Sequence, residues 1–132
     1  APTNTHWSRD NRTVGLRVPA SSAEARRVEN RIPGADINPY LGVAASLVCG
    51  YLGMLEKIEP REEYLGEGYL DRERPLPKSL MDSVDNFTRS KGLRDALGDS
   101  FVDTFAAIKR AEYEHRSSVL SPWDVRFLMT NV

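Results

Sequence analysis

The sequence of 132 residues predicts an α+β fold in which two short antiparallel strands precede about four helices, within a single domain spanning residues 1–132. Three observations support this fold class. Residues 13–18 and 25–32 alternate apolar and polar side chains, as half-buried strands do. Residues 41–55 are almost wholly apolar, and beyond residue 78 apolar side chains recur at helical spacing. A chain of this length commonly forms one domain with its own core.

The first alternating run is interpreted as a strand because its apolar and polar side chains point to opposite faces. Val14, Leu16 and Val18 share one face, and the residues between them share the other. Pro19 and the small polar residues after it end the pattern. We interpret residues 25–32 as the neighbouring strand.

A helix is expected to follow the strands. Asn38 caps free backbone N–H groups, and Pro39 is tolerated at the first helical position. The apolar run 41–55 is shorter than the roughly 20 residues that span a bilayer, so we predict a buried core helix and no membrane span. Cys49 lies in this run, and we expect it to be a buried, inert thiol. A lone cysteine forms no internal disulfide, which favours a cytoplasmic setting.

The remaining sequence predicts one loop and three helices. Residues 60–77 combine prolines, glycines and dense charge without periodicity, which indicates a long surface loop. A helix then begins near residue 80 and ends before Gly98, a residue type typical of helix C-termini. Further helices are expected over about residues 100–116 and, after a Ser-Pro start, over residues 121–128.

The overall charge excludes some classes of partner. Eighteen Lys and Arg residues stand against 19 Asp and Glu residues, a formal net charge of −1. Such a chain has no global field that would draw it to nucleic acid or to an anionic membrane. We therefore expect neither as a partner, and any anion site must be local.

One face of the two expected strands concentrates arginines. Arg17, Arg27 and Arg31 project from the same face. Glu29 lies between the last two, and Arg12 stands at the entrance of the first strand. A ladder of exposed ion pairs, each contributing about 0.2–1 kcal/mol, would explain the pattern. Several arginines around one carboxylate nevertheless leave positive charge uncompensated, which favours a bound anion carrying phosphate and carboxylate groups.

Three ordered motifs resemble the C-terminal signature of glutamine synthetases. They are NRTVGLRVP at residues 11–19, RRVENR at residues 26–31 and NPYL at residues 38–41, the last followed by an apolar helix rich in small residues. The resemblance implies that the two strands belong to the family's catalytic sheet and that the chain is the C-terminal part of a catalytic domain. The implied reaction joins glutamate to ammonia: ATP phosphorylates the side-chain carboxylate of glutamate, and the amine displaces phosphate from this γ-glutamyl phosphate.

The resemblance also implies ATP and Mg²⁺ or Mn²⁺ as cofactors, and a role for each residue of the arginine face. Arg12 would be catalytic, contacting glutamate and the transferred phosphoryl group. Arg31 would bind the reacting carboxylate end of glutamate. Arg17 would bind the ATP phosphates, Arg27 would lie by the nucleotide, and Glu29 would coordinate the metal ion nearer the phosphates. Phosphoryl transfer is accelerated by this kind of positioning and charge neutralisation.

Alternatives concern the acceptor and the class of protein. The acceptor could instead be a polyamine such as putrescine, because Asp10, Asn30 and LPKSL at residues 76–80 resemble the γ-glutamylpolyamine synthetase branch. The family's other metal ligands and its amine site lie upstream of the residues present here, so we expect this chain alone to be inactive. The full-length enzyme is expected to be a cytoplasmic homo-oligomer. A hypothesis of another class is a stand-alone binding or assembly module derived from the ligase.

Overall fold

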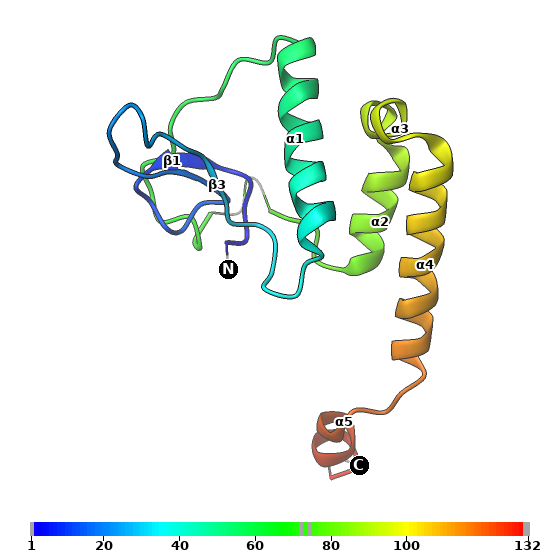
Figure 1. Cartoon of the computed structure of the whole chain (residues 1–132). Coiled ribbons are helices and arrows are strands. Elements are labelled where there is room, and N and C mark those ends of the chain that lie inside the picture. Colours follow the sequence, from blue (N-terminus) through cyan, green and yellow to red (C-terminus); the bar gives the residue numbers. More distant parts are fainter. Residues whose placement is uncertain (1, 72, 74, 131–132) are drawn as a thin grey trace. The chain divides into compact units, whose positions relative to one another are not determined.

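The computed structural model describes residues 2–71, 73 and 75–130. These residues form two compact units, Ala1–Leu76 and Pro77–Val132. The first unit contains a three-stranded sheet and one helix, and the second contains the other four described helices (Figure 1). The predicted α+β class is confirmed. That both units belong to one domain spanning residues 1–132 stays a prediction.

The sheet has the order β1-β2-β3. Its strands are β1 (Trp7–Arg9), β2 (Leu16–Val18) and β3 (Glu29–Asn30). β2 and β3 are antiparallel, as predicted, but β1 runs parallel to β2 and was not predicted. It is too short to show alternation in the sequence. The second predicted strand, 25–32, is wrong in its extent, because the backbone N–H groups of Ala25 and Arg26 form turns with residues 22 and 23 instead of pairing with β2.

A buried asparagine holds the first unit together. The side chain of Asn4 is fully buried. Its amide nitrogen donates to the carbonyls of Thr13 (3.0 Å) and Gly68 (2.9 Å). Its oxygen accepts from the backbone N–H groups of His6 (3.1 Å) and Gly15 (3.3 Å). A Cβ on Gly68 would lie 2.4 Å from the carbonyl oxygen of Thr13, so only glycine permits this approach.

The predicted long loop is confirmed, and it lies against β1. The backbone N–H of Tyr64 donates to the carbonyl of Trp7 (3.1 Å), and the indole N–H of Trp7 donates to the carbonyl of Arg61 (2.7 Å). His6 stacks on the Tyr64 ring at 4.2 Å and contacts the carboxylate of Asp71 at 3.0 Å. The loop is therefore fixed to the sheet by its own side chains and backbone.

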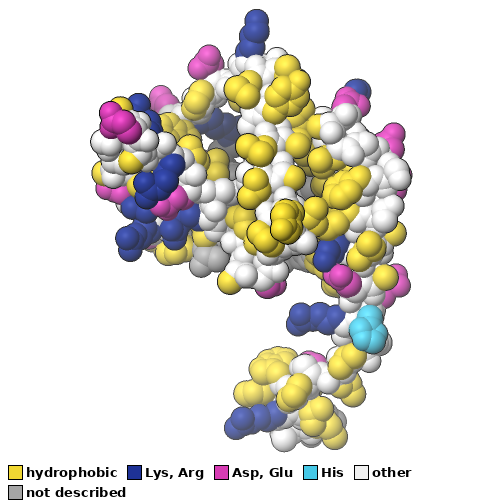
Figure 2. All heavy atoms as spheres, viewed as in Figure 1, with side chains coloured by type: hydrophobic (Ala, Val, Ile, Leu, Met, Phe, Trp, Pro, Cys, Tyr) yellow, Lys and Arg dark blue, Asp and Glu magenta, His cyan; other side chains and the backbone are white. Residues whose placement is uncertain are grey.

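Helix α1 (Pro39–Leu55) begins as predicted. The Asn38 side chain accepts from the backbone N–H groups of Tyr40 and Leu41, and Pro39 lies in the first turn. The prediction of a buried core helix is wrong, since no residue of α1 is buried, and Cys49 is also exposed. Figure 2 shows hydrophobic side chains along the visible face of α1, and many of its large apolar residues are exposed. An exposed stripe at helical spacing consists of Tyr40, Val43, Leu47, Tyr51 and Met54. In the described part of the chain, α1 included, no helix is long and apolar enough to cross a membrane.

The second unit comprises α2 (Leu80–Arg89), α3 (Lys91–Leu97), α4 (Asp99–Ser117) and α5 (Pro122–Leu128). The single helix predicted from residue 80 to Gly98 is two helices. Ser90 has extended backbone angles that end α2, and its hydroxyl caps α3 by accepting from the N–H of Leu93. The predicted capped start of the last helix is confirmed by a reciprocal capping box between Ser121 and Asp124.

Helices α2 and α4 lie side by side and enclose the core of the second unit (Figure 1). Val84, Val102 and Ala106 are buried between them. The ring of Phe87 meets that of Phe105 edge-on at 5.7 Å. Arg94 of α3 completes the packing by donating to the carbonyl of residue 88 and to the carboxylates of residues 99 and 103. Packing between these helices therefore stabilises the second unit.

We predict that Gly98→Ala destabilises the second unit by about 1 kcal/mol. Gly98 has a φ of 84°, a conformation that L side chains rarely adopt, and an added Cβ would meet no atom within 4 Å. The loss would therefore come from backbone strain alone. Urea denaturation of the variant measures it, with Gly50→Ala in α1 as the control, where the added Cβ also meets open space. Since alanine is the better helix former, the control should not lose stability. Equal stability of the two variants would contradict the strain at Gly98.

Candidate phosphate- and carboxylate-binding site

The antiparallel strands and the residues flanking β3 bring three predicted arginines together around the carboxylate of Glu29. Arg17 of β2 lies directly opposite Glu29 of β3, and its Nη1 donates to Oε2 of Glu29 at 3.0 Å. Arg27 Nη2 lies 3.5 Å from Oε1 of the same carboxylate, and Arg31 Nη1 lies 3.9 Å from Oε2. These four side chains, Arg17, Arg27, Glu29 and Arg31, are called the arginine cluster below. The predicted gathering of these side chains is confirmed by their ion pairs, although Arg27 and Arg31 lie outside β3.

Arg12 is placed differently from the other predicted residues. Its side chain is exposed, and within the described part of the chain it has no ion pair or hydrogen bond. Its charge acts on the carboxyl group of Asp10 without touching it. Arg12 is therefore exposed, and its charge acts on Asp10, the residue that contacts Arg17.

Asp10 belongs to the site through its contact with Arg17, although no pattern in the sequence indicated this position. Its Oδ1 accepts from Arg17 Nη2 at 2.7 Å and from the backbone N–H of Ala20 at 3.3 Å. Its own N–H donates to the carbonyl of Val18 at 3.1 Å. The backbone of Asp10 has a φ of 54°, in the left-handed region that Asp tolerates better than most residues. This position precedes the alternating run, so no periodicity indicated that its side chain would turn toward Arg17.

These contacts set the charge states of Asp10 and Arg17. The hydrogen bond from Arg17 lowers the pKa of the Asp10 carboxyl most, and the N–H of Ala20 lowers it next. Loss of water contact acts in the opposite direction, and the charges of Arg17 and Arg12 lower the pKa further. The hydrogen bonds to Asp10 and Glu29 raise the pKa of Arg17 in turn. Both groups are therefore charged at neutral pH.

The Asp10–Arg17 contact should be acid-sensitive. Because the folded-state pKa of Asp10 lies below its ordinary value of 3.8, its contribution to stability is complete above about pH 3.8 and is lost as the pH falls through the lowered pKa. NMR titration of the Asp10 side-chain carboxyl carbon measures this midpoint. In Arg17→Met the midpoint should rise, because the largest cause of the lowering is removed. An identical midpoint in both proteins would contradict the contact.

Ion pairs alone do not satisfy the arginine cluster. The side chains of Arg17 and Arg31 are 13% and 29% exposed. In both, Nε is buried and has no hydrogen-bond partner in the described part of the chain. A buried donor left without a partner costs about 1–3 kcal/mol. The cross-strand ladder of ion pairs therefore exists, but it leaves the Nε–H groups of Arg17 and Arg31 without partners among the described residues.

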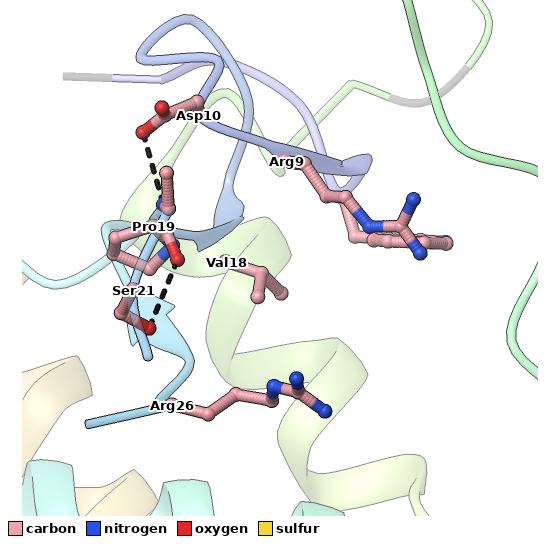
Figure 3. Close-up of a pocket in the computed structure, with 8 residues that line it drawn as sticks. Arg9, Asp10, Val18, Pro19, Ser21 and Arg26 are labelled. Atoms are coloured by element: carbon pink, nitrogen blue, oxygen red, sulfur yellow. Dashed lines mark hydrogen bonds between the residues drawn. The ribbon is translucent and has the colours of Figure 1, made fainter. Parts of the chain in front are cut away.

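A pocket of about 480 Å³ adjoins the cluster at Asp10. In the register of β1 and β2, Arg9 lies beside Val18, whereas Ser8 lies beside Arg17. Side chains alternate along a strand, so Arg9 and Val18 face away from the cluster. Figure 3 shows Val18 between the side chains of Arg9 and Arg26, and a hydrogen bond that Asp10 accepts from the backbone N–H of Ala20. The residues that line the pocket are Trp7, Arg9, Asp10, Val18, Pro19, Ala20, Ser21 and Arg26.

A divalent cation fits these residues poorly by themselves. Among the described residues no three His, Cys, Asp or Glu side chains are grouped so that they could hold a metal ion. Glu29 already contacts three arginines, and hard cations require several oxygen ligands. The described residues thus do not provide the three or more grouped side chains that would hold a metal ion by themselves.

Three arginines around one carboxylate, two of them largely buried, favour the binding of an anionic group. Residues 1–128 match the family model described as the glutamine synthetase catalytic domain. The chain is 40% identical, over 125 residues, to a glutamate–isopropylamine ligase of a Pseudomonas species. That alignment covers 92% of this chain and 27% of the relative.

Two further comparisons agree with this match. The chain is 33% identical, over 131 residues, to a γ-glutamylputrescine synthetase of Escherichia coli strain K12, an alignment covering 98% of this chain and 28% of that protein. The solved structure of apo GmaS without ligand superposes with a TM-score of 0.81 at 30% identity, over 97% of this chain and 30% of the other. The chain therefore belongs to the glutamine synthetase family of ligases. It spans less than a third of the length of these relatives.

Proposed function

We propose that the chain is the C-terminal part of the catalytic domain of an ATP-dependent ligase that joins glutamate to ammonia through a γ-glutamyl phosphate. The observation that carries this proposal is the pair of buried, unpartnered Nε–H groups on Arg17 and Arg31. Two separate donors on one strand face suit a reaction that binds a phosphate and a carboxylate side by side. Family membership indicates the class of reaction. The unpartnered Nε–H groups indicate that this face binds anions.

The residues would divide the two anions between them. Arg17 on β2 would bind the ATP phosphates, with Arg27 by the nucleotide. Arg31, just after β3, would bind the reacting carboxylate end of glutamate. Arg12, which is exposed and unpaired in the described part of the chain, would be catalytic and contact glutamate and the transferred phosphoryl group. Guanidinium groups fixed in these places spread the negative charge that develops during phosphoryl transfer.

The metal requirement would be met only in part by this chain. A bound Mg²⁺ or Mn²⁺ would neutralise phosphate charge, and Glu29 is the residue that could serve as one of its ligands. Further ligands would come from outside the described residues, because among the described residues no three candidate side chains are grouped. We therefore propose that the purified chain does not release ADP in a glutamate-dependent way.

A longer polypeptide would supply the missing parts. The chain covers 27% of the isopropylamine ligase and 28% of the putrescine enzyme. The exposed apolar stripe of α1 is a surface that additional protein could cover. We propose that the complete protein is a cytoplasmic homo-oligomer. The alternative, a stand-alone binding or assembly module, predicts a native gene product of 14.8 kDa, whereas the ligase predicts a band several times heavier on an immunoblot.

A polyamine such as putrescine is the second candidate acceptor. The similarity to a γ-glutamylputrescine synthetase favours it, while the family model is that of glutamine synthetases. The test measures ADP formed by the complete polypeptide with glutamate and either ammonia or putrescine. A large excess of kcat/KM for one amine assigns the acceptor. Failure of both amines would contradict both assignments.

A further inference from the structure

The guanidinium group of Arg17 is held at both of its terminal nitrogens. Asp10, just beyond β1, accepts from Nη2 at 2.7 Å, and Glu29 of β3 accepts from Nη1 at 3.0 Å. The two carboxylates come from opposite neighbours of β2. A planar group anchored at both ends cannot rotate without breaking one of these charge-assisted bonds.

This double anchoring leaves one donor of the Arg17 guanidinium group, its Nε–H, without a hydrogen-bond partner in the described part of the chain. The Nε–H is also buried. A side chain that is 13% exposed and already fixed loses little freedom when a ligand oxygen binds. Arg17 is therefore preorganised to donate to an anion.

Asp10 is itself fixed by the backbone. Its N–H donates to the carbonyl of Val18, and its Oδ1 accepts from the N–H of Ala20 as well as from Arg17. Its φ of 54° turns the side chain back toward β2. One other non-glycine residue in the described part of the chain has a similar φ, Lys57 at 51°, which follows α1. That residue offers a control for backbone strain without any contact to Arg17.

We propose that Asp10 is a positioning residue that fixes the guanidinium group of Arg17 in the orientation in which it receives a phosphate oxygen. The inference rests on the proposed role of Arg17 in binding ATP phosphates and adds a residue to which the family motif assigns no role here. The positioning role and simple electrostatics predict opposite changes in anion affinity when the Asp10 side chain is removed. Removing the negative charge of Asp10 should by itself strengthen anion binding. Weaker binding after its removal is therefore the signature of positioning.

The test titrates the purified chain with pyrophosphate and follows the Arg17 Nε–H resonance by NMR. In Asp10→Gly, glycine adopts the positive φ readily but provides no carboxylate. We expect its dissociation constant to rise about tenfold, and the Nε–H resonance to broaden as the guanidinium group gains rotation. Asp10→Asn retains an acceptor oxygen and tolerates the same backbone conformation. It should bind pyrophosphate at least as tightly as the unaltered chain.

Lys57→Gly serves as the matched control, with the same kind of replacement at nearly the same φ. It should leave both the affinity and the Arg17 resonance unchanged. If Asp10→Gly binds as tightly as the unaltered chain or more tightly, charge alone governs the site and the positioning role is overturned. If the unaltered chain fails to bind pyrophosphate, the phosphate-binding role of Arg17 is overturned and this inference with it. Pyrophosphate binding by the unaltered chain therefore distinguishes failure of the positioning role of Asp10 from failure of the phosphate-binding role of Arg17.

Discussion

Asn4→Asp is expected to unfold the first unit, in which Asn4 is fully buried. The Asn4 side chain donates to two carbonyls and accepts from two backbone N–H groups, all in a fully buried position. A carboxylate cannot donate, so it would face the carbonyl oxygens of Thr13 and Gly68 without a proton between them. Losing two buried bonds and burying a charge should reduce the free energy of unfolding by about 4 kcal/mol or more. That is a large share of the roughly 5–15 kcal/mol that stabilises a typical domain.

Backbone amide NMR spectra and urea denaturation measure this loss. Asn86→Asp, on an exposed position of α2, makes the same chemical change and should alter stability by only about 0.5 kcal/mol. An Asn4→Asp protein as stable as the Asn86→Asp protein would contradict the account of the first unit.

Arg17→Met should weaken pyrophosphate binding about 100-fold, because it removes a fixed guanidinium group that no other described side chain replaces. Arg17→Lys keeps the positive charge. A single ammonium group cannot bridge Asp10 and Glu29 and also donate to a bound phosphate in the same geometry. Its affinity should fall about tenfold. Calorimetry on the purified chain measures both variants.

Arg89→Met makes the same charge change at the end of α2, where the side chain is 78% exposed and lies 3.9 Å from its acidic neighbour. It should leave pyrophosphate binding unchanged. If Arg17→Met and Arg89→Met weaken binding equally, the chain attracts anions through diffuse charge and the arginine cluster is not a site.

Periodicity in the sequence predicted the parts of the fold that local pattern determines. The alternation around Arg17 placed it on the face that carries Glu29, and the residues Asn38 and Pro39 marked the start of α1. Ser90 escaped prediction because one extended residue between two helices leaves the apolar spacing almost unchanged. The exposure of α1 could not be predicted, because burial depends on which other residues are present to cover an apolar helix.

In the candidate site, too, the sequence predicted only what local pattern determines. Strand alternation placed Arg17, Arg27, Glu29 and Arg31 together, and their ion pairs agree with it. Asp10 could not be placed, since its contact with Arg17 depends on a positive φ and on β1 pairing parallel to β2. The roles assigned to Arg12 and to the cluster stay predictions that the binding experiments test.

The central claim, that this chain serves a ligase that forms a γ-glutamyl phosphate, is tested most directly by isotope transfer. The complete polypeptide is supplied with ATP, an acceptor amine and glutamate labelled with oxygen-18 in its side-chain carboxylate. If the carboxylate attacks the terminal phosphorus of ATP and the amine later displaces phosphate, each phosphate released carries one labelled oxygen. Release of unlabelled phosphate alone would contradict the claim, because the phosphoryl group would then have passed to water and not to glutamate.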